Sequence, residues 1–596
     1  MGGRLDAQLT NESQLTTDWN PVWEVAVEQF DNGWVMEAAL PFKSLRYRPG
    51  VTQVWGFQAR RVNRWKNETS YLTPLSAAQA NRGHFRALLA ATVVGLEAPR
   101  GARTLDFKPY AISDVTTDLM GSPRVANDLS GDLGLDVKYG VTQNLTVDFT
   151  FNADFAQVEA DEQQVNLTRF SLFFPEKREF FLENQGTFGF GGVATSGRQA
   201  GASAAPVLFY SRQIGLHHGR VVPIRAGGRL TGRVGGFSLG VLTIQSDDEV
   251  ISGAQATNFT VVRLKRDLLR RSSVGALFAG RSISLNGEGS NEAFGVDGTF
   301  GFFDDLTINT HWARTRTPGI KADDISYRGQ LDYRGDRYGA EFEHLYVAEN
   351  FNPEVGFVRR HDMRRSFGLL RFSPRPRSLD GVRKFSFTGS INYIENGARL
   401  LETREWDSEF SVELENSDMF TAGYRNSYEF LPEPFPIADA VTLPIGGYGF
   451  LSGRLGYNFG PQRHVSGNVL LEFGGFFDGQ KTAISVSRGR LNITSQMSVE
   501  PIYSINLVDL EQGSFTTHLT GTRATYTVTP LMFTSALVQY NSSIDAVSAN
   551  VRFRWEYRPG SELFVVFNEE RGTVSRRFPQ LKNRAFIVKI NRLFRF

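Results

Sequence analysis

Apolar and polar residues alternate with a period of two through most of this chain. In 133–141 the odd-numbered positions are apolar, and the even-numbered positions hold Gly, Asp, Lys and Gly. After a turn at 142–144, the alternation resumes in 145–153, and it returns in 327–333 and 547–557. Successive side chains of a strand point to opposite faces, so the pattern predicts strands with one apolar and one polar face. Helical periodicity is excluded for this part of the chain.

The number and length of these segments favour a membrane barrel over a soluble sandwich or propeller. They continue from about residue 104 to 596, which at roughly 20 residues per strand and connection gives about 22–26 strands. Strands of about 10 to 13 residues are longer than the globular norm and suit a tilted bilayer crossing. Aromatic residues gather at strand ends, as in an interfacial girdle. Full charges stand in the middle of polar faces, at Asp148, Arg328, Asp332, Arg552 and Arg554.

The chain ends on such a strand, whose apolar parity includes Phe586, Ile590 and Phe596. A terminal strand that finishes in phenylalanine resembles the signal that delivers bacterial outer-membrane barrels to their assembly machinery. Phe596 is therefore the candidate assembly signal. The expected partners are outer-membrane lipid and the barrel assembly machinery.

Charge and composition exclude several classes of protein. The 65 basic and 63 acidic residues leave a net charge of +2, so no nucleic-acid partner is expected. The absence of cysteine excludes disulfides and thiolate metal sites. No apolar stretch is long enough for a transmembrane helix. The first residues also lack a signal peptide, which predicts either a cytoplasmic protein or an N-terminus lost by truncation.

The first hundred residues differ from the rest and hold five of the eight tryptophans. The segments 33–46 (GWVMEAALPFKSLR) and 55–61 (WGFQARR) resemble the second half of a family 9 carbohydrate-binding module. The larger first half of such a module does not precede them, which favours truncation. We therefore expect residues 1–98 to form a partial β-sandwich in front of the barrel, and the whole chain to be all-β.

The resemblance implies a sugar-binding surface in this part of the chain. Aromatic faces can stack on a pyranose while polar neighbours bond its hydroxyls, and large aromatics also serve as core residues. Both roles stay open for the tryptophans. The candidate carbohydrate-binding residues are Trp55, Trp65, Arg60, Arg61 and Asn63.

A dense polar and aromatic block follows the first barrel strands. It comprises 154–161 (DFAQVEAD), 166–170 (NLTRF) and 174–183 (FPEKREFFLE), with 210–215 (YSRQIG) downstream. This block resembles a bacterial family with a C-terminal domain of unknown function, DUF5916, whose members carry a family 9-type sugar-binding domain. We therefore expect a DUF5916-like barrel over 99–596 with an internal plug segment near 155–205.

The charged residues of the block admit several interpretations. A plug that crosses the lumen and forms ion pairs with the wall is favoured over a sugar or metal site, and catalysis ranks last because nothing pairs two carboxylates at a fixed separation. No cofactor is expected, and calcium at Asp154 and Asp161 is only a weak alternative because the EF-hand pattern is absent. The polar cluster of the lumen or plug comprises Asp154, Glu159, Asp161, Arg169, Glu176, Lys177, Arg178 and Glu183.

Three functions remain in competition. The leading one is a protein of the bacterial outer membrane that binds glycans or oligosaccharides through its module and could admit them. The second is a secreted or surface hydrolase of O-glycosyl bonds, which rests on family association alone. The third is a structural or assembly protein of the envelope.

Overall fold

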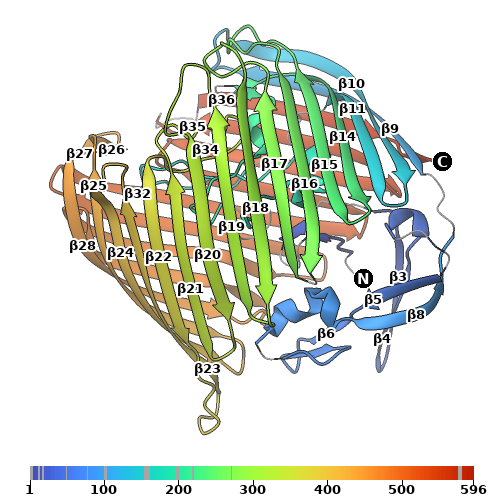
Figure 1. The fold of residues 1–596 in the computed structure, drawn as a ribbon, viewed down its shortest axis with the longest axis horizontal. Helices are drawn as coiled ribbons and strands as arrows, with labels where there is room; N and C mark the ends of the chain where they lie inside the picture. Colours follow the sequence, from blue (N-terminus) through green and yellow to red (C-terminus); the bar gives the residue numbers. More distant parts are fainter. Residues whose placement is uncertain are drawn as a thin grey trace.

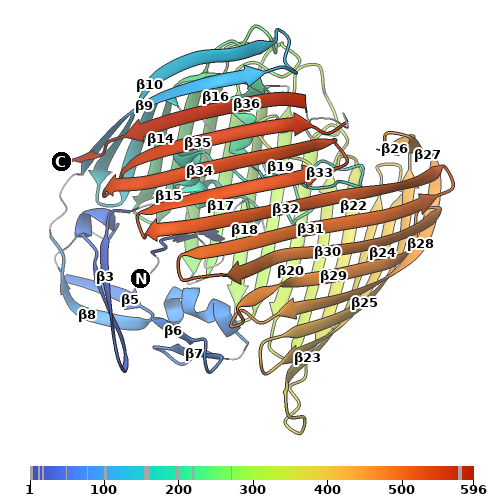
Figure 2. The same cartoon turned by 180° about the vertical axis from the view of Figure 1, so that it is seen from behind.

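The described part of the chain is dominated by one closed antiparallel barrel (Figures 1 and 2). The structure is a computed structural model that describes residues 4–10, 14–16, 19, 21–47, 50, 52–76, 78–99, 104–153, 161–195, 201–217, 220–269, 271–574 and 580–596. The barrel has 24 strands when β36 and β37 are counted as one interrupted strand. The prediction of an all-β fold with a barrel of 22–26 strands is confirmed.

The barrel strands follow one another in chain order and pair with their neighbours. They are β9 (Leu105–Asp118), β10 (Val125–Thr142), β11 (Leu145–Ala153), β14 (Ile224–Val234), β15 (Phe237–Ser246), β16 (Asn258–Leu269), β17 (Ser272–Arg281), β18 (Asn291–Phe302), β19 (Leu306–Arg316), β20 (Ile325–Arg334), β21 (Tyr338–Val347), β22 (Met363–Phe372), β23 (Val382–Glu395), β24 (Leu401–Leu414), β25 (Met419–Leu431), β28 (Gly446–Phe459), β29 (Val465–Phe476), β30 (Gly479–Asn492), β31 (Met497–Leu510), β32 (Gly513–Thr529), β33 (Met532–Asn541), β34 (Ala546–Arg558), β35 (Ser561–Gly572), β36 (Gln580–Asn591) and β37 (Phe594–Arg595).

Closure satisfies the backbone groups that an open sheet would leave unpaired at its two edges. The last strand closes the barrel on the first: Phe586 of β36 pairs with Val115 of β9, and Phe594 of β37 pairs with Phe107 of β9. The alternation seen in the sequence sorts the side chains between the two surfaces. In β20, Tyr327, Leu331 and Tyr333 are exposed on the outer face. Ser326, Arg328 and Asp332, of the opposite parity, are buried towards the lumen.

The two ends of the barrel differ in the length of their connections. At one end most turns are short, as at 143–144, 235–236 and 559–560. The other end carries longer connections, including 247–257, 348–362 and 432–445. The connection 432–445 contains a hairpin of β26 (Phe435–Ala438) and β27 (Val441–Leu443). The first barrel strand starts, and the last one ends, at the short-turn end.

The connection between β11 and β14 folds back into the lumen. Its described parts contain α1 (Glu179–Leu182), η4 (Gln185–Phe188), η6 (Ser211–Gln213) and the short strands β12 (Leu216–His217) and β13 (Arg220–Val221). We call the described residues 161–195 and 201–217 the inner segment. No helix among the described residues is long and apolar enough to cross a membrane.

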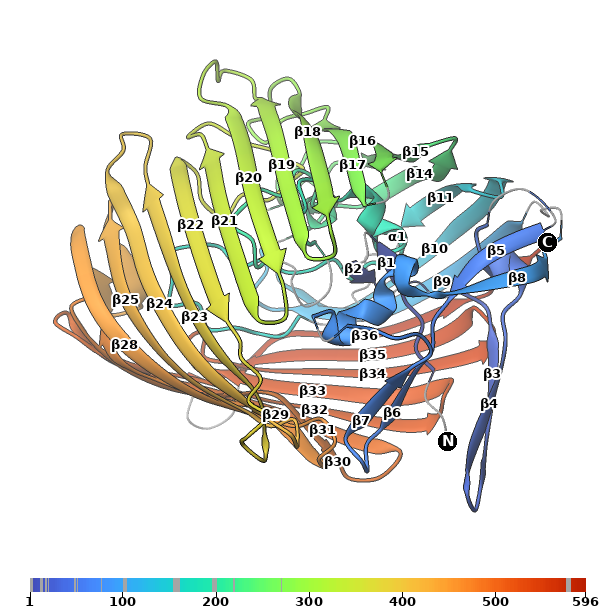
Figure 3. The same cartoon turned by 60° about the horizontal axis from the view of Figure 1, so that its bottom comes forward.

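The N-terminal residues form small hairpins at the short-turn end (Figure 3). Their elements are β1 (Gln8–Thr10), β2 (Gln14–Thr16), β3 (Glu24–Phe30), β4 (Gly33–Ala39), η1 (Phe42–Ser44), β5 (Thr52–Phe57), β6 (Arg60–Asn63), β7 (Glu68–Tyr71), η2 (Ala80–Phe85), η3 (Ala87–Leu89) and β8 (Ala91–Glu97). They pair as β1–β2, β3–β4, β5–β8 and β6–β7, each a two-stranded sheet. The domain boundaries and the sandwich inferred for this part stay predictions.

Candidate functional site

The inner segment packs against one side of the barrel wall through an apolar core. Phe181, Phe188 and Leu208 of the segment lie in the same buried cluster as the inward-facing Leu242 and Leu345 of the wall. Apolar burial contributes about 25 cal/mol per Å² of buried area, so these aromatic and aliphatic contacts hold the segment to β14–β22. The sequence pattern did not predict this, because lumen-facing positions were expected to be polar.

Ion pairs tie α1 to strands β9–β11 and β14. Lys108 lies 2.8 Å from the carboxylate of Glu179, and Lys138 pairs with Glu183. Arg229 donates a hydrogen bond to the carbonyl oxygen of Glu183 at 2.6 Å and pairs with Asp148 at 3.0 Å. Each charged side chain of this group therefore has a counter-ion.

The first part of the inner segment reaches the opposite wall. Arg169 lies 3.1 Å from Glu402 and from Glu429, on β24 and β25. The Gln163 backbone amide donates to Gln539 of β33 at 3.0 Å. The segment therefore contacts both sides of the lumen. These contacts accord with the predicted plug, which stays a prediction for 155–205 as a whole.

The remaining charged residues of the predicted cluster bind one another within the segment. Arg178 pairs with Glu176 at 2.6 Å, and the Ser211 hydroxyl donates to the same carboxylate at 2.6 Å. Asp161 lies 3.4 Å from Lys177 and 2.8 Å from Arg212. Two further predicted members, Asp154 and Glu159, lie outside the described residues.

The cations around α1 keep its carboxylates ionised. Lys108 lowers the pKa of Glu179 to about 2 against the opposing effect of burial, although 56% of that side chain is exposed to the lumen. Burial would raise the pKa of Glu183, but Lys138 and Arg229 lower it to about 2. Burial would also raise the pKa of Glu176, and hydrogen bonds from Arg178 and Ser211 hold it below its ordinary value. A glycosidase acid needs a carboxyl group with a raised pKa, so these three carboxylates are ion-pair anchors rather than proton donors at neutral pH.

The N-terminal hairpins contact the rim of the barrel at widely separated points. Arg4 pairs with Glu556 near the β34–β35 turn at 2.8 Å. Asn67 donates to the carbonyl oxygen of Glu415 in the β24–β25 turn at 2.7 Å, and Arg86 donates to that of Asp304 in the β18–β19 turn at 2.9 Å. The hairpins thus extend across the short-turn mouth.

The structure places the candidate sugar-binding residues on exposed hairpins. Trp55 in β5 lies against Phe42 and Tyr47, with ring centroids 6.1 Å and 6.0 Å away. Trp65 lies in the β6–β7 turn and is 95% exposed. Arg60 and Arg61 are exposed on β6, and the Asn63 side chain accepts the Lys66 amide at 3.3 Å. Their role in sugar binding stays a prediction.

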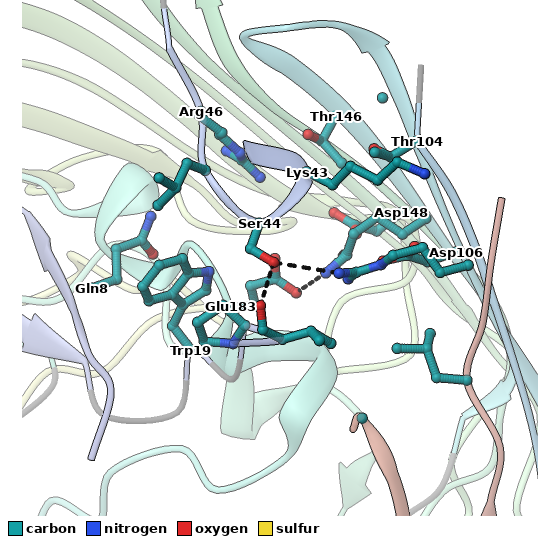
Figure 4. A pocket seen from close by; sticks show the side chains of 18 of the residues that line it. Gln8, Trp19, Lys43, Ser44, Arg46, Thr104, Asp106, Thr146, Asp148 and Glu183 are labelled. Atoms are coloured by element: carbon teal, nitrogen blue, oxygen red, sulfur yellow. Dashed lines mark hydrogen bonds and ion pairs between the residues drawn. The ribbon is translucent and has the colours of Figure 1, made fainter. Parts of the chain in front are cut away.

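A cavity of about 670 Å³ lies where the N-terminal hairpins, the barrel wall and α1 meet (Figure 4). Gln8 and Trp19 lie on one side of it and Asp106 and Asp148 on the other, with Glu183 between them. Gln8 also donates to Asn184 of the inner segment at 3.1 Å. Its other lining residues include Lys43, Ser44, Arg46, Phe42, Tyr47, Lys108, Lys138, Arg229 and Arg595.

Sequence reasoning identified Glu183 but missed most of this cavity, because its residues come from distant parts of the chain. Ser44 and Arg595, for example, lie within 3.4 Å of each other. The charged residues that alternate with apolar ones in β10 and β11 were the sequence signal that could have indicated this cavity. Among the described residues, no cluster of His, Asp and Glu side chains could hold a metal ion; the residue paired with Asp161 in the calcium alternative, Asp154, is outside them.

Comparison with solved structures finds chains that align with most of this one at low identity. The Ferric-Catecholate import receptor Fiu from E. coli K12 shares 9% identity over 88% of this chain and 86% of its own, with a TM-score of 0.37. OpdQ from Pseudomonas aeruginosa shares 7% identity over 83% of this chain and 98% of its own, with a TM-score of 0.26. The outer membrane protein OpdK from the same organism shares 9% identity over 83% and 99%, with a TM-score of 0.27.

The sequence comparisons identify one segment of the chain. No curated protein sequence matches the chain. The model of a domain of unknown function, DUF5916, matches residues 102–220, which run from before β9 through the inner segment. The chain is thus a closed antiparallel β-barrel whose residues 102–220 match the model of the domain of unknown function DUF5916.

Proposed function

We propose that this protein binds glycans or oligosaccharides in the cavity beside α1 and admits them through the barrel when the inner segment moves. The observation that carries the proposal is the cavity itself. It combines aromatic side chains with hydroxyl, amide and charged groups, where the inner segment meets the mouth of the barrel. A volume of about 670 Å³ lies within the range of small-molecule sites.

The chemistry of the lining suits a polyhydroxylated ligand. Trp19, Phe42 and Tyr47 offer flat apolar faces to the C–H groups of a sugar ring. Charged side chains of both signs, such as Asp148 and Arg229, can bond hydroxyl groups without selecting an ion. Because Trp55 packs on Phe42 and Tyr47, it supports this cavity from behind.

The orientation of the barrel follows from its connections. In bacterial outer-membrane barrels the short turns face the periplasm and the long loops face outward. The N-terminal hairpins and the cavity would then lie at the periplasmic mouth. The inner segment, which enters from the long-loop end, would stand between the outside and the cavity.

Binding by the full-length protein in detergent, measured calorimetrically against a panel of oligosaccharides, tests the proposal. We expect a binder whose affinity falls about tenfold or more in Trp19→Ala, since aromatic contacts contribute about 1 kcal/mol beyond their buried area. Trp65→Ala is the matched control, because Trp65 does not line the cavity. Loss of binding in Trp65→Ala alone would move the site to the exposed hairpins. The absence of binding to any glycan would refute the proposal and favour a structural role.

A further inference from the structure

The outer face of the barrel carries an apolar depression at strands β20–β25, near the short-turn end. Its volume is about 860 Å³. Register places its side chains on one surface, since Tyr338 pairs with Phe372, Phe372 with Phe387 and Phe387 with Phe410. The opposite parity of the same strands carries the lumen ion pairs, such as Arg365 with Glu343 and Arg425 with Asp407. The depression therefore opens towards the membrane.

A row of aromatic rings bounds this depression. The ring centroids of Tyr338 and Phe372 are 5.5 Å apart, those of Phe372 and Phe387 are 6.4 Å apart, and those of Phe387 and Phe410 are 4.9 Å apart. The first two pairs are stacked. Beside them, a Cβ atom on Gly389 would meet nothing within 4 Å, so the surface is open at that point. A flat aromatic wall next to an open floor fits a flexible hydrocarbon chain.

Positive charge lies at the end of the depression, where the short β20–β21 turn meets the membrane boundary. Arg337 is exposed, and its guanidinium carbon lies 5.8 Å and 5.4 Å from the ring centroids of Tyr338 and Phe372. The neighbouring Asp336 pairs with Arg375 at 2.8 Å and with Lys384 at 3.7 Å. Asp336 is thus already paired with two cations, and the exposed Arg337 beside the aromatic row favours an anionic group.

We propose that this depression is a phospholipid site, in which an acyl chain lies against the aromatic row and Arg337 contacts the phosphate. The site depends on the barrel spanning a membrane and is independent of the proposed glycan cavity, which lies inside the barrel wall. Arginine suits a phosphate at this position because its planar guanidinium can donate two parallel hydrogen bonds.

Native mass spectrometry of the full-length protein in detergent, titrated with phosphatidylglycerol or with diacylglycerol, tests the site. We expect one phosphatidylglycerol to be retained after other lipids have been removed. Gly389→Leu fills the depression without a steric conflict and should lower that retention at least tenfold. Gly329→Leu is the matched control, because Gly329 is also an exposed barrel glycine whose Cβ would meet nothing within 4 Å.

A second pair of variants tests the role of the positive charge of Arg337. Arg337→Gln should lower the preference for phosphatidylglycerol over diacylglycerol about fivefold, since a basic residue near a membrane surface contributes about 1 kcal/mol. Arg266→Gln is its control, because Arg266 lies over Phe237 at 5.1 Å elsewhere on the barrel. Equal retention by wild type and Gly389→Leu would overturn the proposal. A dimer that Gly389→Leu dissociates would instead identify the depression as an interface between copies of the chain.

Discussion

Glu183→Gln removes one of the two carboxylate charges that tie the α1 region to the barrel wall, and the contacts of Glu183 give the size of the effect. Glu183 pairs with Lys138, and the exposed fractions of their side chains are 19% and 36%. Breaking a fully buried pair costs about 3–5 kcal/mol, and exposed pairs contribute about 0–1 kcal/mol. Because this pair is only partly buried, we expect its loss to destabilise the docked inner segment by about 2 kcal/mol. Because Arg229 also binds backbone carbonyls of the segment, the change should loosen α1 without unfolding the barrel.

A cost of about 2 kcal/mol raises the population of the displaced segment about thirtyfold. Hydrogen exchange of 179–188 and single-channel conductance in planar bilayers measure that population directly. The control is Glu472→Gln, which breaks a lumen pair with Lys481 at 3.1 Å that involves wall strands only. Faster exchange and more frequent opening are expected in Glu183→Gln alone. If the two variants behave alike, the pair with Lys138 does not hold the segment.

Three further predictions concern the pH dependence, the packing of the core and the assembly of the barrel. The pKa values of Glu179 and Glu183 are lowered to about 2, so the stability that their ion pairs contribute is complete above the ordinary pKa of 4.5 and is lost as the pH falls towards 2. The single-channel conductance should therefore stay constant from pH 7 to 5 and rise below about pH 4.5. Phe351→Ala should lower the free energy of unfolding, measured by chemical denaturation, by about 3–5 kcal/mol, because Phe351 is fully buried in the core shared with the inner segment. Replacement of the outward-facing Phe342 by Ala should lower it by less than about 1 kcal/mol. Phe596→Ala should reduce the fraction of heat-modifiable barrel in outer-membrane fractions, and an unchanged fraction would exclude an assembly role for this residue.

The wall of the barrel could be predicted because its pattern is local. Every other residue of a wall strand faces outward, so a short window around Phe149 or Tyr327 already contains the signal. Closure then follows from the need to pair both edges of the sheet. The strand range was correct because short turns, such as 143–144, offset long connections, such as 432–445.

The filling of the lumen could not be predicted in the same way. Leu242, Ile244 and Val261 face inward but are apolar, because they meet the inner segment and not water. This exception to the alternation depends on residues far along the chain. The partners of Lys108 and Lys138 likewise become neighbours only after the barrel closes and the segment folds back.

The same argument applies to the N-terminal residues. Their tryptophans suggested a sugar surface around Trp55 and Trp65, whereas the cavity that the structure forms uses Trp19 and Tyr47. Trp19 belongs to no regular strand, so no periodic pattern singled it out. It lines the cavity together with Glu183 of the inner segment and Arg595 of the last strand, which are distant in sequence.

A reversible cross-link tests most directly whether the inner segment controls passage. Val207 of the segment and Phe357 of the β21–β22 connection form an antiparallel bridge, with mutual backbone hydrogen bonds of 2.9 Å and 2.8 Å. Opposed residues of this kind have Cα atoms about 5.5 Å apart, which suits a disulfide. The chain has no cysteine of its own, so Val207→Cys with Phe357→Cys forms one defined bond.

Oligosaccharide uptake into proteoliposomes should then be compared for the oxidised and the reduced protein. We predict that oxidation abolishes the uptake shown by the wild type and that reduction restores it. Equal uptake in both states would contradict the account, because passage would then not require the inner segment to move.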